Sequence, residues 1–175
     1  NFLKVFAAGA VGTVGSIALG PLAGLTGAQE SGTLRVAWLT PASLDPRSAS
    51  GDSEIGFLNA VYDYLINTDA ASNLLPALAS SWEVSEDGLQ YTLQIREDAT
   101  FHDGSALTVD DVVWTINWQK EAEGTVAGLL SNATFTAGDG NTLIITLEET
   151  NPDFLFNLTD NKLVILKSGA EGIGE

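Results

Sequence analysis

Residues Leu75–Asp111 read LPALASSWEVSEDGLQYTLQIREDATFHDGSALTVDD and carry most of the structural information in the chain. Between Leu89 and Arg96 apolar and polar residues alternate, which is typical of a strand with one buried face. Ser81–Ser85 alternates in the same way. Asp87-Gly88 separates the two runs and suits the positive φ of a tight hairpin turn. The stretch therefore predicts an antiparallel hairpin, with Val84 among the residues of its buried face.

The end of this stretch predicts the start of a helix. Asp103-Gly104 ends an extended segment, and Thr108 stands three residues before Asp111. Thr108 can accept a hydrogen bond from the backbone N–H of Asp111, as in a capping box, and acids at this end favour the helix dipole. The large apolar residues of the helix are Val112, Trp114, Ile116 and Trp118. Tryptophans at this spacing could form a platform for a ligand, but packing at the core and its boundary is the expected role.

Five motifs, in this order and spacing, resemble the signature of one protein family. They are Leu75-Pro-Ala-Leu-Ala-Ser-Ser-Trp82, Asp87-Gly88, Tyr91-Thr-Leu-Gln-Ile-Arg96, Phe101-His-Asp-Gly104 and Leu107-Thr-Val-Asp-Asp-Val112. The chain resembles the family 5 extracellular solute-binding proteins, the binding components of ABC importers for oligopeptides, dipeptides, nickel and related solutes. Leu44-Asp-Pro46 extends the resemblance back to about Leu34, and it becomes loose after Glu121.

The resemblance implies an α/β fold, a periplasmic-binding-protein-like (type II) lobe with a mixed sheet and flanking helices. Proteins of this kind are much longer and have two lobes joined by a hinge. Residues 29–175 are therefore expected to be the N-terminal part of the first lobe, with the second lobe absent and the fold incomplete. We expect this part alone to bind no ligand of the family measurably.

Asn1–Ala28 has the pattern of an export signal peptide. Lys4 is the only charged residue before Glu30, Val5–Leu19 is an apolar run, and Thr26-Gly-Ala28 resembles a signal peptidase site. The alternative is an uncleaved membrane anchor, because the uncharged stretch is long enough to span a bilayer. Either segment predicts a periplasmic or otherwise extracytoplasmic protein, tethered to the membrane in the second case.

The composition narrows the function classes. The chain has no cysteine, which excludes disulfides and thiolate metal sites within it. It has 23 acidic and 7 basic residues and a formal net charge of −16, and such a surface repels nucleic acid and anionic membranes. A generally acidic, soluble surface is the favoured explanation of this charge, and attraction of cationic ligands is the alternative.

The expected ligand contacts lie in a loop after the first strand. Leu34–Leu39 predicts a short buried strand, and Asp45 cannot begin a helix because the residue before a proline is extended. In peptide-binding members of the resembled family, the backbone of this loop lines the cleft and can pair with an extended ligand like an added strand. The matching residues are Ser48, Ala49, Ser50, Gly51 and Asp52. The alternative is an ordinary solvated loop.

Two further elements are expected between this loop and the hairpin. A helix capped by Ser53 is predicted, because apolar residues recur at spacings of three and four. These residues are Ile55, Leu58, Tyr62 and Leu65. Asn67–Asn73 then reads as a turn.

The last third of the chain predicts a second hairpin and two short elements. Glu121–Ser131 is weakly patterned and reads as a loop. Thr134–Thr136 and Thr142–Leu147 predict a hairpin with Leu143, Ile145 and Leu147 on one face. Asn151-Pro152 suits the N-cap and first residue of a helix over Asp153–Leu158. Leu163–Leu166 predicts a last short strand.

The sequence gives little support to an enzyme. His102 is the only histidine, and there is no Gly-x-Ser-x-Gly elbow and no His-Glu-x-x-His motif. His102 beside Asp103 is expected to be a structural or surface residue of a turn. Asp110-Asp111 and Glu148-Glu149 could serve glycoside hydrolysis, but neighbouring acids more often belong to a helix start or a solvated face. No catalytic residue, metal ion or cofactor is expected.

On the resemblance, the expected function is the capture of a solute outside the cytoplasm and its delivery to the permease subunits of an ABC transporter. A peptide is the preferred solute, and the protein is expected to be a monomer that binds no nucleic acid. Two alternatives stay open. One is a secreted hydrolase or carbohydrate-active fragment that uses its acidic residues, and the other is a binding lobe that serves a sensor.

Overall fold

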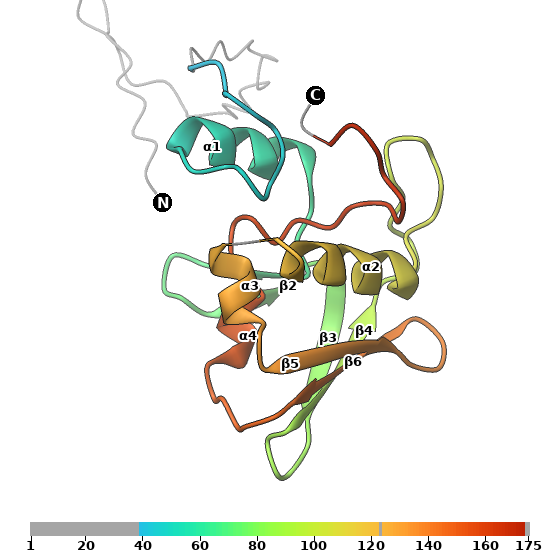
Figure 1. Cartoon of the computed structure of the whole chain (residues 1–175). Helices are drawn as coiled ribbons and strands as arrows, with labels where there is room; N and C mark the ends of the chain where they lie inside the picture. The colour runs from blue at the N-terminus through green and yellow to red at the C-terminus, as the bar shows by residue number, and fades with distance from the viewer. Residues whose placement is uncertain (1–38, 123, 174–175) are drawn as a thin grey trace, which may run out of the picture. The chain divides into compact units, whose positions relative to one another are not determined.

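The computed structural model describes residues 39–122 and 124–173. The expected signal peptide and the expected strand up to residue 38 lie outside the described residues. Figure 1 shows the elements in chain order. The helices are α1 (Asp52–Val61), α2 (Val109–Lys120), α3 (Thr125–Leu129) and α4 (Phe154–Asn157). The strands are β1 (Ile66–Thr68), β2 (Leu74–Pro76), β3 (Ala79–Val84), β4 (Gln90–Ile95), β5 (Ala133–Ala137) and β6 (Thr142–Leu147).

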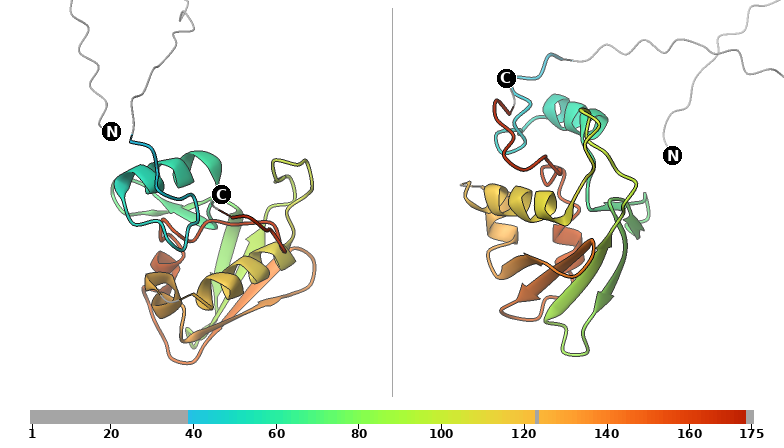
Figure 2. Two further views of the ribbon diagram at one scale, coloured as in Figure 1. Left: turned by 45° about the horizontal axis from the view of Figure 1, so that its top comes forward. Right: turned by 90° about the vertical axis from the view of Figure 1, so that its right-hand side faces the viewer.

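A four-stranded sheet of order β3-β4-β6-β5 forms the centre of the described fold, and β1 and β2 form a separate pair. Every strand pairing among the described residues is antiparallel. Helix α2 packs against β5 and β6 and covers one face of the sheet (Figures 1 and 2). The expected α/β architecture with flanking helices is confirmed, but the expected mixed sheet is not seen among the described residues, where hairpins join the strands in pairs and every pairing is antiparallel.

The core lies between this sheet and α2. On β4 and β6 every second side chain is buried, with Leu93, Ile95, Leu143 and Ile145 fully inaccessible. Burial of such a side chain contributes about 1.5–3 kcal/mol to folding, so the alternation holds both strands in one register. The two predicted hairpins are confirmed, and Leu93 lies opposite Leu143 where they join.

The first hairpin differs from its prediction in two details. Its turn is longer than a two-residue turn. The backbone N–H of Ser85 donates to the carbonyl oxygen of Gln90, which closes the turn, and within it the N–H of Gly88 donates to the carbonyl oxygen of Ser85. Gly88 alone of this turn takes a positive φ, +67°, which glycine adopts without strain. Val84 is 48% exposed rather than buried, because it is the last residue of the edge strand β3, next to the hairpin turn.

The predicted capping box of α2 is confirmed. The backbone N–H of Thr108 donates to the Asp111 carboxylate over 2.9 Å, and the Asp111 N–H donates to the Thr108 hydroxyl over 3.3 Å. This exchange satisfies two N–H groups at the start of the helix. Trp114 and Trp118 are half-buried on α2 and stack with ring centroids 6.0 Å apart, as expected for boundary packing.

Several predicted boundaries are wrong. Helix α1 begins one residue earlier than Ser53 and has Gly51 as its N-cap. Glu121–Ser131 contains the short helix α3, and Asp153 rather than Asn151 caps α4. Leu163–Leu166 forms only an isolated bridge, between Val164 and Tyr64. Strands β1 and β2 have no equivalent among the predictions, and β1 includes Asn67 and Thr68, which were predicted to belong to a turn at Asn67–Asn73.

The segment Leu163–Leu166 forms no strand because a side chain takes the place of a strand partner. The N–H of Leu166 donates to the Thr115 hydroxyl over 3.1 Å, and that hydroxyl lies 2.9 Å from the Leu166 carbonyl oxygen. The N–H of Ser168 donates to Asp111 over 2.8 Å. Two side chains of α2 therefore fix the course of this segment.

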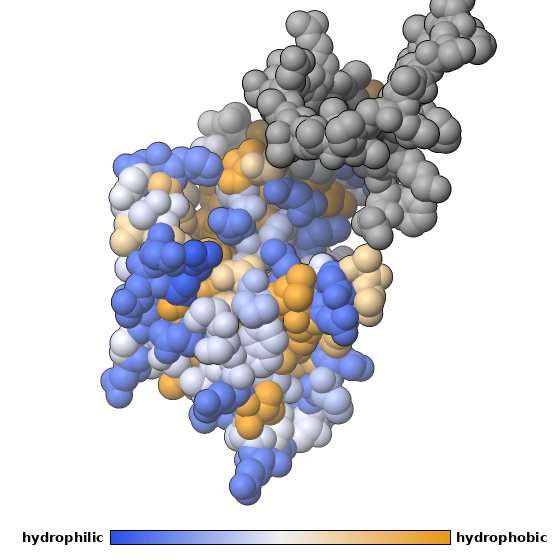
Figure 3. All heavy atoms as spheres, turned by 180° about the vertical axis from the view of Figure 1, so that it is seen from behind, coloured by the Kyte–Doolittle hydropathy of each residue, from blue (hydrophilic) through white to orange (hydrophobic). Residues whose placement is uncertain are grey.

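Among the helices of the described residues, none has both the length and the apolar character that a bilayer span requires. Figure 3 shows the face behind Figure 1, where hydrophilic residues predominate and apolar areas are small and separate.

Candidate ligand-binding site

Of the predicted ligand residues, Ser48–Gly51 form a loop and Asp52 is the first residue of α1. Ala49 is fully buried, whereas Ser48 and Ser50 are exposed on either side of it. Gly51 has an extended backbone, with φ −107° and ψ 157°. The structure thus brings the predicted residues together as one exposed loop, anchored by the methyl group of Ala49.

The backbone N–H groups of this loop are directed toward the protein. Ser48 and Ala49 donate to the carbonyl oxygen of Asp45 over 3.1 and 3.0 Å. Ser50 and Gly51 donate to the carboxylate of Glu54 over 3.1 and 2.6 Å. Four consecutive N–H groups therefore have acceptors within the described residues.

Glu54 is a functional candidate that the sequence analysis missed. Its carboxylate also accepts from the N–H of Ala42 over 3.3 Å, so it connects the beginning and the end of the loop. These hydrogen bonds, from Gly51 first and then from Ser50 and Ala42, hold the pKa of Glu54 below its ordinary value. Its place three residues after Gly51, as in a capping box, was the available signal in the sequence.

Arg47 and the stacked rings of Trp114 and Trp118 lie beside the loop. The central guanidinium carbon of Arg47 stands 3.7 Å from the ring centroid of Trp118, and a guanidinium nitrogen of Arg47 lies 3.5 Å from the Asp45 carboxylate. Ala49 shares a small apolar cluster with Leu58 of α1, against which both tryptophans of α2 pack. A cation over an aromatic ring contributes about 0.5–1 kcal/mol at an exposed site, so Arg47 is held in place. The loop is thereby attached to both α1 and α2.

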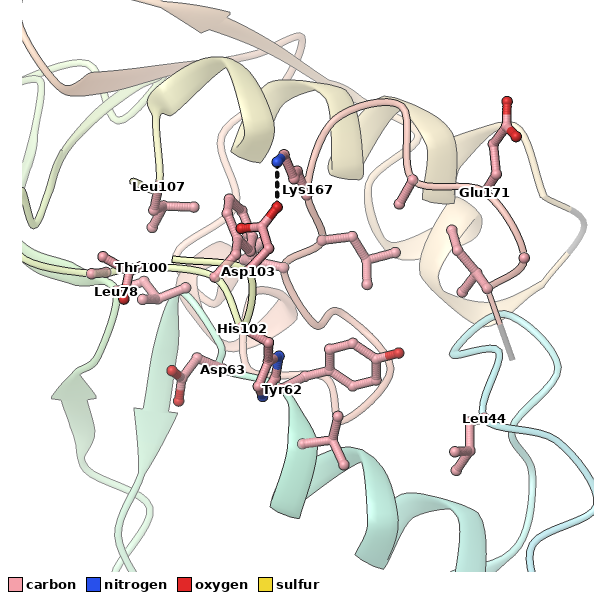
Figure 4. A pocket seen from close by; sticks show the side chains of 18 residues that line it. Leu44, Tyr62, Asp63, Leu78, Thr100, His102, Asp103, Leu107, Lys167 and Glu171 are labelled. Carbon is pink, nitrogen blue, oxygen red and sulfur yellow. Dashed lines mark hydrogen bonds and ion pairs between the residues drawn. The ribbon is translucent and has the colours of Figure 1, made fainter. Parts of the chain in front are cut away.

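A cavity of about 430 Å³ lies between the segments that carry Tyr62, Asp103 and Lys167 (Figure 4). None of the predicted residues Ser48–Asp52 lines it, although Leu44 and Tyr62 do. Most of the lining is apolar, and the volume falls in the range of small-molecule pockets. No sequence pattern predicts this cavity, because its walls come from segments far apart in the chain.

Charged side chains stand at one wall of the cavity. Lys167 donates to the Asp103 carboxylate over 2.6 Å (Figure 4), and the Ser105 hydroxyl donates to it over 2.6 Å. Together with the Ser105 backbone N–H, these contacts lower the pKa of Asp103, with Lys167 as the largest cause. His102 is exposed in this turn, as expected, and the hydrogen bonds of Asp103 go to other partners.

Comparison with known proteins identifies the relatives of this chain. Residues 73–172 match the bacterial extracellular solute-binding proteins, family 5 (middle part). The chain is 30% identical over 115 residues to the periplasmic murein peptide-binding protein MppA of Escherichia coli, and the aligned stretch covers 66% of the chain and 21% of MppA. It is 34% identical over 88 residues to the oligopeptide-binding protein AppA of Bacillus subtilis, and this alignment covers 50% of the chain and 16% of AppA.

Solved structures agree with this result. The periplasmic binding protein AgaA from A. tumefaciens R10, in complex with agropinic acid, superposes with a TM-score of 0.68 at 26% identity. The superposition covers 74% of this chain and 27% of AgaA. The chain spans about a fifth of the length of the curated relatives it matches. The expected type II periplasmic-binding-protein-like fold is confirmed, and the match over residues 73–172 shows that the chain belongs to the family 5 bacterial extracellular solute-binding proteins.

Proposed function

We propose that this protein captures a solute, preferably a peptide, outside the cytoplasm and delivers it to the permease subunits of an ABC transporter. The observation that carries the proposal is the family match over residues 73–172. The names of MppA and AppA, which describe peptide-binding proteins, support a peptide as the solute. The name of MppA also supports a periplasmic location.

Residues 29–175 would form the N-terminal part of the first lobe, after a signal peptide at Asn1–Ala28. In such a protein a hinge joins two lobes, and the solute stabilises the closed form because it binds that form more tightly. The closed form of a monomer then docks on the permease. The acidic net charge of −16 supports a protein that works away from nucleic acid.

Ser48–Asp52 are the proposed contacts of this lobe with the solute. Their support is the exposure of Ser48 and Ser50 and the small size of the side chains, which leaves the backbone accessible to an extended ligand. Because Ala49 and Glu54 fix the loop, it would not need to be ordered when the solute binds, and preorganisation of this kind favours affinity.

A thermal-shift screen of the full-length protein tests the proposal. The panel contains di-, tri- and pentapeptides, agropinic acid as the known ligand of a relative, simple sugars and Ni²⁺. A ligand at 100 times its Kd stabilises the folded state by about 2.7 kcal/mol, so peptides should raise the melting temperature by several degrees. A shift with sugars and none with any peptide would contradict the proposed solute and favour a carbohydrate-active protein.

A further inference from the structure

Glu54 combines burial with a negative charge. Only 9% of its surface is exposed, and a buried carboxylate requires compensating hydrogen bonds. All the hydrogen bonds that it accepts within the described residues come from backbone N–H groups, those of Ala42, Ser50 and Gly51. The side chain of Glu54 therefore fixes a stretch of backbone and forms no ion pair among these residues.

The backbone that Glu54 fixes is the loop proposed to contact the solute. One carboxylate oxygen accepts from Ser50 and Gly51, and the other accepts from Ala42 before the turn at Pro46. A single side chain thus closes both ends of the loop. The buried methyl group of Ala49 adds a third attachment point between these two ends.

Gly51 provides a second, independent observation. A Cβ atom at this position would lie 2.9 Å from the Glu54 carboxylate oxygen, closer than real Cβ atoms come to other atoms. The φ of −107° at Gly51 suits any residue, so glycine is not required by the backbone. The absence of a side chain at Gly51 is what allows the carboxylate to reach the loop.

This arrangement also determines which groups the loop can offer to a ligand. The N–H groups from Ser48 to Gly51 already donate to Asp45 and Glu54. The carbonyl oxygens of the exposed Ser48 and Ser50 accept no hydrogen bond from other described residues. A ligand at Ser48–Gly51 therefore meets backbone acceptors and must supply donors, such as peptide N–H groups or an ammonium group.

We propose that Glu54 is a positioning residue of the solute site: it holds the N–H groups of Ser50 and Gly51 inward, so that the loop presents backbone carbonyl groups to a hydrogen-bond-donating solute. This inference rests on the proposed function, in which Ser48–Asp52 contacts the solute. Glu54 acts through the loop and does not itself touch the ligand.

Two variants of the full-length protein test the proposal. Glu54→Gln removes the negative charge that strengthens these hydrogen bonds and replaces one of the two accepting oxygens by an NH₂ group, which donates and cannot accept. Gly51→Ala leaves the charge of Glu54 unchanged but displaces its carboxylate. The control is Glu149→Gln, which makes the same charge change at an exposed glutamate distant from the loop in sequence.

Amide hydrogen exchange, measured by NMR, shows whether the N–H groups of the loop are hydrogen-bonded in the absence of any ligand. The amide protons of Ser50 and Gly51 should exchange about tenfold faster or more in Glu54→Gln, because a lost hydrogen bond to a charged group is worth roughly that factor. Those of Leu93 and Ile145, in the central sheet, should keep their protection and show that the fold is intact. The control Glu149→Gln should match the wild type at all four positions.

Calorimetric titration with the tripeptides trialanine and trilysine measures the affinity of the solute site. Both Glu54→Gln and Gly51→Ala should weaken peptide binding about tenfold, and Glu149→Gln should leave the affinity unchanged.

Unchanged exchange at Ser50 and Gly51, or unchanged affinity despite faster exchange, overturns the positioning role. Loss of protection at Leu93 in both variants also overturns it, since Glu54 would then support the whole fold. A wild type that binds neither peptide contradicts the proposed peptide function instead, and the exchange experiment still decides whether Glu54 holds the loop.

Discussion

Thr115 shows how one buried hydroxyl can stabilise two segments of the chain. It is fully buried, and its hydroxyl lies 2.8 Å from the Asp111 carbonyl oxygen and 2.9 Å from that of Leu166. Thr115→Val keeps the shape of the side chain but leaves the N–H and carbonyl of Leu166 without this partner. We expect the free energy of unfolding to fall by about 1–3 kcal/mol.

Urea unfolding of the full-length protein measures this change. The matched control is Thr146→Val, the same substitution at an exposed position of β6, which should change stability by no more than about 0.5 kcal/mol. Equal effects of the two substitutions would show that the Thr115 hydroxyl contributes nothing specific.

The ionisation of Asp111 makes the stability of the fold vary with pH in the acidic range. Burial raises the pKa of this carboxyl group, but hydrogen bonds from Thr108 and Ser168 outweigh burial and lower it overall. A carboxyl group with a lowered pKa stabilises the folded protein above its unfolded pKa, and the stabilisation disappears as the pH falls through the folded pKa. Asp111→Asn should therefore cost about 1–2 kcal/mol near pH 7, with the difference narrowing below about pH 4.

Denaturant unfolding over a pH series checks this dependence, with Asp110→Asn as the control. Asp110 carries the same charge at the neighbouring position of α2, but it is exposed. Its substitution should change stability little at any pH. A constant difference between Asp111→Asn and the wild type from neutral to acidic pH would be incompatible with a role for the ionised carboxylate.

Among the elements, the two hairpins could be predicted because a single local rule determines them. Alternation of apolar residues along β4 and β6 specifies which face is buried, and the buried set follows that pattern from Tyr91 to Leu147. Removal of one member tests the rule. Leu93→Ala should cost about 2–5 kcal/mol through lost burial and the cavity that remains.

The comparison for Leu93→Ala is Val84→Ala in β3. Val84 belongs to the same sheet but is 48% exposed, so its truncation should cost less than about 1 kcal/mol. Urea unfolding of both variants gives the two values. A loss at Val84 as large as that at Leu93 would mean that the edge strand is covered by another part of the protein.

The elements that could not be predicted depend on partners distant in sequence. Leu163–Leu166 has the composition of a strand, but its hydrogen bonds go to the Thr115 side chain and to the backbone of Asp63. The short helix α3 has no regular apolar spacing, and only Val126 among its residues is buried. The Gly51 N-cap differs from the Ser53 prediction because Glu54, and not a hydroxyl, accepts the N–H groups at this helix start.

For the molecule as a whole, the sequence motifs predicted the family and the fold class, whereas the details of the site required the structure. The loop Ser48–Asp52 was placed by its distance from Leu44-Asp-Pro46, and it stays a proposed site. The inward orientation of the Ser50 and Gly51 N–H groups could not be predicted, because it depends on the reach of the Glu54 side chain. The cavity near Asp103 combines residues from five separate regions of the chain.

In the proposed two-lobed protein the solute site is shared between the lobes, so we expect residues 29–175 alone to bind no ligand of the family. A part of one lobe would supply only some of the contacts that favour the closed state. Calorimetric titration of this segment with trialanine should give no heat of binding up to millimolar concentration. Micromolar binding would show that the described loop and its surroundings form a complete site.

Titration calorimetry of the full-length protein with peptides of two to five residues is the decisive test of solute capture. We expect one-to-one binding of at least one such peptide with a Kd in the micromolar range or tighter. Absence of binding to every peptide, together with hydrolysis of a peptide or glycoside substrate by the same preparation, would contradict it.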